Sequence, residues 1–152
     1  MNEEEKLEYY MKIALLQAKI GFKLDEVPVG AVIVKENKII AKAYNLKESK
    51  KSAVYHAEIL AINKASKKLK SWNLTGCSIF ITMQPCLMCY GAILSSRISS
   101  IYFGAYDKKY GLEVEKYNEL NTKGFNHKAN IIGGVLEEEC SQILTDFFKV
   151  KR

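Results

Sequence analysis

The sequence predicts a layered α/β sandwich, because segments with helical and strand periodicity alternate along its 152 residues. Amphipathic helical spacing near the N-terminus precedes two β-branched runs, and shorter strands and helices then follow in turn. Helices between successive strands favour helices packed on the faces of a sheet. The 48% hydrophobic and 26% charged residues are typical of a globular chain and exclude wholesale disorder. We therefore expect one domain over residues 1–152.

The first half of the chain predicts a helix, a hairpin and a second helix. Apolar residues recur at helical spacing near the N-terminus: Leu7, Tyr10, Met11, Ala14, Leu15 and Ala18. Gly21 is expected to end this helix. Residues 30–34 and 39–43 are apolar runs joined by a short polar segment, which predicts a β-hairpin. Helical periodicity returns over residues 56–69.

The second half predicts shorter elements. Residues 77–82 and 98–103 have strand character, and residues 87–95 between them have helical character. Residues 130–135 are a candidate fifth strand, and residues 136–150 are expected to form the closing helix. Five strands and four helices follow from these patterns.

Charge and hydropathy narrow the possible partners and location. Lys and Arg total 23 against 17 Asp and Glu, which gives a net charge of +6. This excess suits a polyanion such as nucleic acid, and equally suits a surface tuned for solubility. The chain has no apolar run of about 18 residues and no apolar segment after its acidic start. We expect a cytoplasmic protein without a membrane helix.

The segment Pro85-Cys86-Leu87-Met88-Cys89 lies between a predicted strand and a predicted helix. Proline is tolerated at a helix entry, and the two cysteines then lie in the first turn, at the positive end of the helix dipole. That position favours thiolates, which ligate metals or attack disulfides. The motif alone leaves three alternatives open: a redox pair, half of a zinc site, or two buried thiols.

His56-Ala57-Glu58, at the start of the preceding predicted helix, separates these alternatives. One imidazole and two thiolates are typical zinc ligands, and three protein ligands leave the fourth position for water, as in catalytic sites. Glu58 is then available to carry protons. Residues two apart point to opposite sides of a helix, so we expect His56 at the helix cap. A redox pair leaves His56 and Glu58 unexplained, and we therefore predict zinc-dependent hydrolysis.

The combination H-x-E with P-C-x-x-C is the signature of the zinc deaminases. From about residue 7 to its end, the chain resembles the bacterial tRNA-specific adenosine deaminases of the cytidine/deoxycytidylate deaminase superfamily. Further segments carry the resemblance: Glu26-Val27-Pro28-Val29-Gly30-Ala31-Val32, Tyr44-Asn45, Ser96-Arg97-Ile98, Phe103-Gly104-Ala105-Tyr106-Asp107, Asn126-His127 and Asp146-Phe147-Phe148-Lys149.

The resemblance implies a three-layer α/β/α cytidine-deaminase-like sandwich with a mixed five-stranded sheet. It implies hydrolytic deamination of adenosine to inosine at the wobble position of a tRNA anticodon, with an arginine tRNA as the expected substrate. The alternative is a zinc-dependent deaminase of a free nucleobase or nucleoside, of the guanine or cytosine type. A zinc-stabilised RNA-binding domain without activity is a third hypothesis, and the intact Glu58 argues against it.

The resemblance also assigns a role to each matching residue. His56, Cys86 and Cys89 are expected to hold one Zn²⁺ per chain, with Glu58 as the catalytic proton carrier. Substrate contacts are expected from the purine-binding Asn45, the pocket-wall residues Val27, Pro28 and Ala57, the ribose-phosphate loop residues Asp107 and Lys109, the base-contacting Phe147, and the phosphate-binding Lys149 or Arg152.

The same family implies a homodimer that binds a tRNA anticodon stem-loop. The helix after Cys89 offers small and apolar residues that would suit a dimer interface, or would pack on its own sheet: Tyr90, Gly91, Ala92, Ile93 and Leu94.

Three segments depart from the family pattern. Residues 52–55 read Ser-Ala-Val-Tyr where Asp-Pro-Thr-Ala is common, and Met83-Gln84 stands before Pro85 where Leu-Glu is usual. Residues 112–115 read Leu-Glu-Val-Glu where small residues are common. None of these is an expected metal ligand. The remaining Cys77 and Cys140 are expected to be buried free thiols, and His127 is expected to be structural or substrate-adjacent.

Overall fold

The computed structural model describes residues 1–121 and 125–151, and a mixed five-stranded sheet lies at its centre. The strand order is β2-β1-β3-β4-β5. β1 pairs antiparallel with both β2 and β3, whereas β3–β4 and β4–β5 are parallel. The strands are β1 Gly30–Lys35, β2 Lys38–Tyr44, β3 Cys77–Met83, β4 Ser100–Ala105 and β5 Asn130–Ile132.

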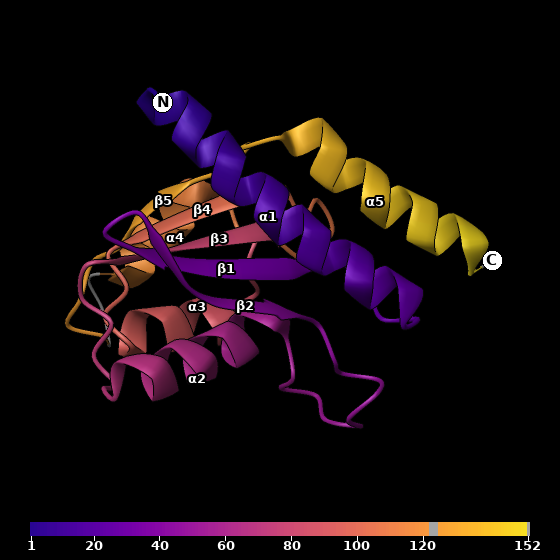
Figure 1. Cartoon of the computed structure of the whole chain (residues 1–152). Coiled ribbons are helices and arrows are strands. Elements are labelled where there is room, and N and C mark those ends of the chain that lie inside the picture. The colour runs from indigo at the N-terminus through magenta and orange to yellow at the C-terminus, as the bar shows by residue number, and fades with distance from the viewer. Residues whose placement is uncertain (122–124, 152) are drawn as a thin grey trace.

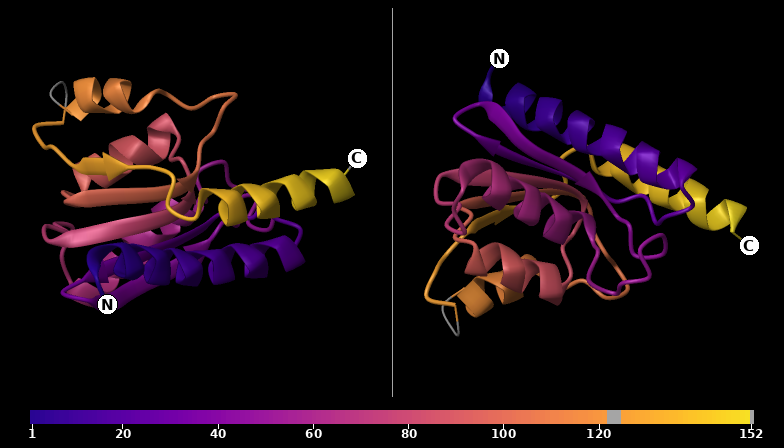
Figure 2. Two further views of the ribbon diagram at one scale, coloured as in Figure 1. Left: turned by 90° about the horizontal axis from the view of Figure 1, so that it is seen from above. Right: turned by 60° about the horizontal axis from the view of Figure 1, so that its bottom comes forward.

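Helices cover both faces of the sheet, which confirms the predicted three-layer α/β/α sandwich (Figures 1 and 2). α1 (Glu3–Lys23) and α5 (Glu137–Val150) lie side by side on one face. α2 (Ala57–Leu69) and α3 (Leu87–Ser95) cover the other face, and α4 (Val114–Asn121) lies beside α3. Each face has its own buried apolar cluster. None of these described helices is long and apolar enough to span a membrane.

α1 extends further at both ends than its apolar periodicity predicts. Asn2 caps the helix: its side-chain oxygen accepts the Glu5 backbone N–H at 2.8 Å, and the Glu5 carboxylate accepts the Asn2 N–H. The expected stop at Gly21 is wrong, because the helix continues to Lys23. A Cβ at Gly21 would meet Tyr44 at 3.6 Å, an ordinary contact distance, so a small side chain would fit there. The chain turns instead at Asp25, whose φ is 64°.

The hairpin is confirmed, with a turn of two residues. Glu36 and Asn37 both have positive φ, 51° and 62°, as the primed turns that match the twist of a hairpin require. The register shifts between Ile33 and Val34: Ile33 pairs with Ala41 and Val34 pairs with Ile39, so the extra residue lies in β2, the strand that leaves the turn.

α4 is the element that the sequence prediction missed. It is short and strongly polar, but Tyr117 on it is only 1% exposed and belongs to the apolar cluster beneath α2 and α3. Leu112 and Val114 of the atypical 112–115 segment pack against the same cluster. That segment therefore anchors α4 to the core.

Smaller differences concern the strand bounds and the remaining buried groups. β4 lies two residues later than expected, and β5 ends at Ile132, three residues early. Cys77 and Cys140 are free and fully buried, as predicted. One His127 ring nitrogen, Nε2, lies 2.8 Å from the Ile98 carbonyl oxygen, which fits the predicted structural role.

Candidate functional site

Two helix N-termini meet at one end of the sheet and bring the metal-ligand candidates together. His56 is the residue before α2, and Cys86 is the residue before α3, in the short turn that follows β3. His56 has φ −76° and ψ 154°, which is extended backbone, so the predicted cap position is confirmed. Because His56 is outside the helical repeat, its ring and the Glu58 carboxyl both reach the same cavity.

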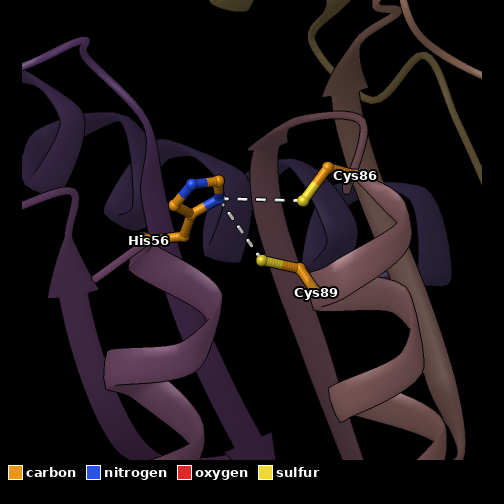
Figure 3. A group of neighbouring side chains, drawn as sticks. All are labelled: His56, Cys86 and Cys89. Carbon is orange, nitrogen blue, oxygen red and sulfur yellow. Dashed lines mark hydrogen bonds between the residues drawn. The ribbon is translucent and has the colours of Figure 1, made fainter. Parts of the chain in front are cut away.

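The three candidate ligand atoms lie close to one another. His56 Nδ1 is 3.7 Å from Cys86 Sγ and 3.5 Å from Cys89 Sγ (Figure 3). All three atoms lie within 4.8 Å of one another, so the described residues contain a His-Cys-Cys group placed to bind a metal ion. Cys89 is fully buried and Cys86 is exposed, which leaves the group open toward the cavity.

The charges of this group favour a cation. A hydrogen bond from the Cys89 thiol lowers the pKa of Cys86 to about 4, so Cys86 is a thiolate at neutral pH. The contact between the His56 ring and the Cys86 thiolate raises the pKa of His56. The Cys89 pKa is raised, because the thiol proton is shared with Cys86 and the side chain is buried. A metal ion that bound here would displace these protons.

Glu58 is the buried acid of the site. Its side chain is 4% exposed and lines the cavity near the metal-ligand group. Desolvation by burial raises the pKa of Glu58 to about 7, and the negative charge of Cys86 acts in the same direction. A carboxyl group with a pKa near the working pH can both accept and release a proton during a reaction.

A cavity of about 230 Å³ unites the metal-ligand group with several predicted substrate residues. Its lining includes residues from the predicted set: Val27, Asn45, His56, Ala57, Glu58, Cys86 and Asp107. Four lining residues were not predicted: Val29, Lys47, Met83 and Gln84. Lys47 could have been predicted, because the basic character of its loop is visible in the sequence. For Met83-Gln84 the only signal in the sequence was the departure from the family pattern.

The prediction of Pro28 in the cavity wall needs correction. Pro28 is buried and does not line the cavity. The Val29 N–H donates to the Val27 carbonyl oxygen at 2.8 Å, so the chain makes a tight turn centred on Pro28. This turn presents Val27 and Val29 to the cavity.

Asn45 is held at the cavity wall by contacts on both sides of its amide. Its Nδ2 donates to the Val27 carbonyl oxygen at 3.4 Å, and its Oδ1 accepts the Lys47 N–H at 3.2 Å. The amide retains a second N–H and a second lone pair for a ligand. Its orientation is therefore fixed before any ligand binds.

Asp107 and Lys109 lie on the loop between β4 and α4. Asp107 Oδ1 accepts the Lys109 and Tyr110 N–H groups at 3.1 and 3.0 Å, which shapes the loop. Lys109 is exposed, does not line the cavity, and places its ammonium 5.2 Å from the Tyr110 ring centre. The structure thus brings Asp107 to the site and leaves Lys109 on its rim.

One C-terminal candidate, Phe147, lines a second, more open hollow, whose lining shares Val27 with the first. Phe147 lines it and is only 6% exposed, because its ring packs edge-on against Phe22, whereas Phe148 is 48% exposed. Lys149 is exposed to solvent. Arg152 lies outside the described residues.

The buried Glu26 connects these two hollows. Its carboxylate accepts the Glu48 N–H at 3.0 Å and also the Ser49 N–H and hydroxyl, so it holds the 46–51 loop. Although burial alone would raise the pKa of Glu26, these hydrogen bonds lower it. Lys47 on the same loop lines the first cavity, and Glu48 and Ser49 line the second.

The residues offered for a dimer interface are mostly buried in the chain itself. Tyr90, Ile93 and Leu94 belong to its own core, so the structure assigns them to packing on the sheet, and Gly91 and Ala92 are half-buried. The exposed apolar side chains on α3 are instead Leu87 and Met88, 58% and 38% exposed.

Comparisons with known proteins identify the family of the chain. Residues 4–152 match the family model described as MafB19-like deaminase. The chain is 44% identical to a tRNA-specific adenosine deaminase of Bacillus subtilis over 95% of this chain and 90% of the relative. It is 45% identical to a protein of the same name from Aquifex aeolicus, over 95% of each chain.

Solved structures share the fold. A structure from a study of A-to-I editing by tRNA:A34 deaminases superposes with a TM-score of 0.83 at 33% identity, over 90% of this chain and 99% of that one. A guanine deaminase from Nitrosomonas europaea superposes with a TM-score of 0.80 over 92% of this chain and 83% of that one, at 23% identity. The first similarity extends to sequence, and the second is one of fold.

Proposed function

The chain belongs to the family of tRNA-specific adenosine deaminases, and from that membership we propose that it converts adenosine to inosine at the wobble position of a tRNA anticodon. An arginine tRNA is the expected substrate. Water is the co-reactant: a C–O bond forms at purine C6, the C6–N bond breaks, and ammonia leaves. Because the substrate is tRNA, we expect the reaction to take place in the cytoplasm, carried out by residues 1–152 as one domain.

One observation carries the proposal: the His-Cys-Cys group and a buried carboxyl line the same small cavity. Its volume, about 230 Å³, is below the roughly 300–1,000 Å³ of most small-molecule pockets. A single flipped base fits such a volume better than a larger ligand does, and enzymes that modify bases extrude them into pockets of this kind. The unpaired bases of an anticodon loop are splayed at low cost.

Zinc fits the donor set and its spacing. Tetrahedral zinc with Zn–N of about 2.0–2.1 Å and Zn–S of about 2.3 Å separates nitrogen from sulfur by about 3.6 Å. The observed separations are 3.7 and 3.5 Å. We propose that His56, Cys86 and Cys89 hold one Zn²⁺, which when bound supplies an activated water in the cavity.

The surrounding residues then have distinct tasks. Glu58, with its pKa near 7, takes a proton from the attacking water and returns it to the departing amino group. Asn45 offers its remaining amide N–H and lone pair to the purine, and Val27 and Ala57 form the apolar wall beside the ring.

The rim residues are proposed to bind the rest of the anticodon loop. Asp107 and Lys109 lie where a ribose-phosphate chain would leave the cavity, and Lys149 and Arg152 are expected at phosphates. We retain Phe147 as a proposed base contact, but the more exposed Phe148 beside it offers the larger ring face.

The test is a panel that measures ammonia release from stem-loops, nucleosides and nucleobases. A stem-loop with adenosine at the wobble position should react, and the same stem-loop with that adenosine moved into the paired stem should not. Elemental analysis of the same preparation should give about one zinc per chain. Release from free guanine or cytosine instead of RNA would replace this proposal with the alternative function. Absent metal, with Cys86 and Cys89 joined as a disulfide, would overturn the zinc site.

We also propose a homodimer, as the family resemblance implies, with the exposed Leu87 and Met88 as candidate interface residues. Light scattering at micromolar concentration should then give twice the chain mass of 17.2 kDa. A monomeric particle would contradict it.

A further inference from the structure

Gln84 is a buried amide directly before the metal-binding turn. It is 6% exposed, although it also lines the cavity. Its backbone N–H donates to the Ala105 carbonyl oxygen at 2.8 Å, which fixes the residue between the ends of β3 and β4. The backbone of Gln84 is therefore fixed, and its side chain starts from a defined position.

Both ends of this amide bind the loop between β4 and α4. Oε1 accepts the Asp107 N–H at 2.9 Å, and Nε2 donates to the Leu112 carbonyl oxygen at 2.5 Å. The two partners are the first and last residues of the 107–112 loop. One side chain thus joins the two ends of this loop.

The loop also packs directly on the Gln84 side chain. A Cβ at Gly111 would lie 2.4 Å from Gln84 Oε1 and 2.4 Å from the Asp107 carbonyl oxygen. The Gly111 N–H donates to that same carbonyl oxygen at 2.8 Å. The absence of a side chain at Gly111 is therefore what permits the loop to rest on Gln84.

An amide at residue 84 satisfies both loop contacts at once. A carboxylate could accept the Asp107 N–H, but its second oxygen would face the Leu112 carbonyl oxygen, and two acceptors repel each other. The sequence departs from the family pattern at both ends of this contact, at Met83-Gln84 and at residues 112–115. Gln84 reaches the second of these segments through the backbone carbonyl oxygen of Leu112.

Tyr117 extends the contact to the metal-binding turn. Gln84 Nε2 also donates to the Tyr117 hydroxyl at 3.1 Å, and that hydroxyl donates to the Pro85 carbonyl oxygen at 2.8 Å. Tyr117 is 1% exposed and packs edge-on against Tyr90 at 4.6 Å between ring centres. Loop, α4 and the residue before Cys86 are thus held together by buried polar contacts.

We propose that Gln84 is a positioning residue for substrate binding, whose amide fixes the 107–112 loop and so holds Asp107 at the mouth of the cavity. The inference rests on the proposed function for its link to RNA.

The experiment compares Gln84→Glu with Gln142→Glu, an equal change of charge on an exposed residue of α5. Three quantities are measured: kcat and KM on the anticodon stem-loop, hydrogen exchange of peptides covering residues 106–113, and zinc content. For Gln84→Glu, KM should rise about 10-fold, as expected if one loop in ten remains competent. Loop exchange should accelerate, while kcat stays within about two-fold and the zinc content does not change. Gln142→Glu should leave all of these unchanged.

A second variant keeps the test decisive if Gln84→Glu fails to fold. Gly111→Ala leaves the amide in place but forces the loop off it, and should give the same KM and exchange changes. Unchanged KM and loop exchange in the folded variants would overturn the inference, as would a fall in kcat with KM intact. If the unmodified protein does not deaminate the stem-loop, the proposed function fails, while the exchange comparison still decides whether Gln84 holds the loop.

Discussion

The centre of the site and its rim are built in different ways. The centre is supplied by two short motifs at the starts of α2 and α3, and its ligand atoms lie within 4.8 Å of one another. The rim is supplied by the segment before β1 and by the 46–51 and 107–112 loops. These segments are far apart in sequence, and buried polar side chains from elsewhere hold the two loops: Glu26 for the first and Gln84 for the second.

The difference separates chemistry from substrate choice. Residues of the centre are set by the requirements of a metal and a proton carrier, which few residue types meet. Residues of the rim are instead held through backbone contacts to distant buried side chains. We therefore expect variants of the centre to lower kcat and variants of the rim to raise KM.

The largest expected effect is at the centre, in Glu58→Gln. The amide keeps the size and polarity of the carboxyl but cannot carry a proton. Turnover should fall by at least about 100-fold, the scale of general acid–base catalysis, with KM little changed. Single-turnover kinetics on the anticodon stem-loop measure this directly.

The matched control is Glu48→Gln, the same change on an exposed residue of the 46–51 loop, which should leave turnover intact. Zinc content and stem-loop affinity should also survive in Glu58→Gln. Activity close to the unmodified level would remove Glu58 from the proposed mechanism.

The sequence could predict the centre because its signals are local. His56 at a helix cap and Cys86 and Cys89 in a first turn follow from spacing and helix geometry, and the structure places all three as expected. The hairpin followed from two apolar runs around a polar segment.

The rim could not be predicted, because its contacts depend on long-range packing. No periodicity indicates that Gln84 reaches Leu112, or that Glu26 binds the backbone of Glu48. α4 was missed because its helix is polar and only Tyr117 anchors it deeply. Gly21 did not end α1, which continues for two more residues to Lys23 before the chain turns at Asp25.

A medium effect is expected at Glu26, which tests whether the rim loops depend on buried polar contacts. Glu26→Gln places an N–H₂ group where backbone and hydroxyl donors now meet a carboxylate, so it should lower the free energy of unfolding by about 1–3 kcal/mol. KM for the stem-loop should rise because the loop carries Lys47, while kcat changes little. Denaturant unfolding and steady-state kinetics measure the two effects, and Glu48→Gln is again the control.

The pH dependence of stability distinguishes this contact from ordinary packing. The folded-state pKa of Glu26 is lowered, so the carboxylate stabilises the fold above its unfolded pKa of about 4.3, and that stability is lost as the pH falls through the folded value. The unmodified protein should therefore lose more stability than Glu26→Gln between about pH 5 and pH 3. Parallel losses in both proteins would show that the ionised form of Glu26 is not what holds the loop.

The smallest expected effect concerns the cations at the end of α5. Lys149 is exposed, whereas the Lys151 ammonium pairs with Asp25 and lies 5.7 Å from the Phe147 ring centre. A lysine already paired with a carboxylate has less charge to offer a phosphate. If α5 contributes to the RNA footprint, Lys149→Ala should weaken stem-loop binding a few-fold and lower the magnitude of the salt slope by about 0.7–0.9, the value of one phosphate contact.

Lys151→Ala should change the slope less than Lys149→Ala does, because the Lys151 ammonium already pairs with Asp25 and so makes no phosphate contact that could be lost. An exposed ion pair contributes only about 0–1 kcal/mol to stability. Lys67→Ala, in the last turn of α2 at the opposite end from His56, is the control for net charge and should leave the slope unchanged. A helix C-terminus favours cations through its dipole whether or not RNA binds there. Equal slopes for all three variants would therefore assign Lys149 to the helix end alone, and the phosphate contacts would have to come from the loop that carries Lys47.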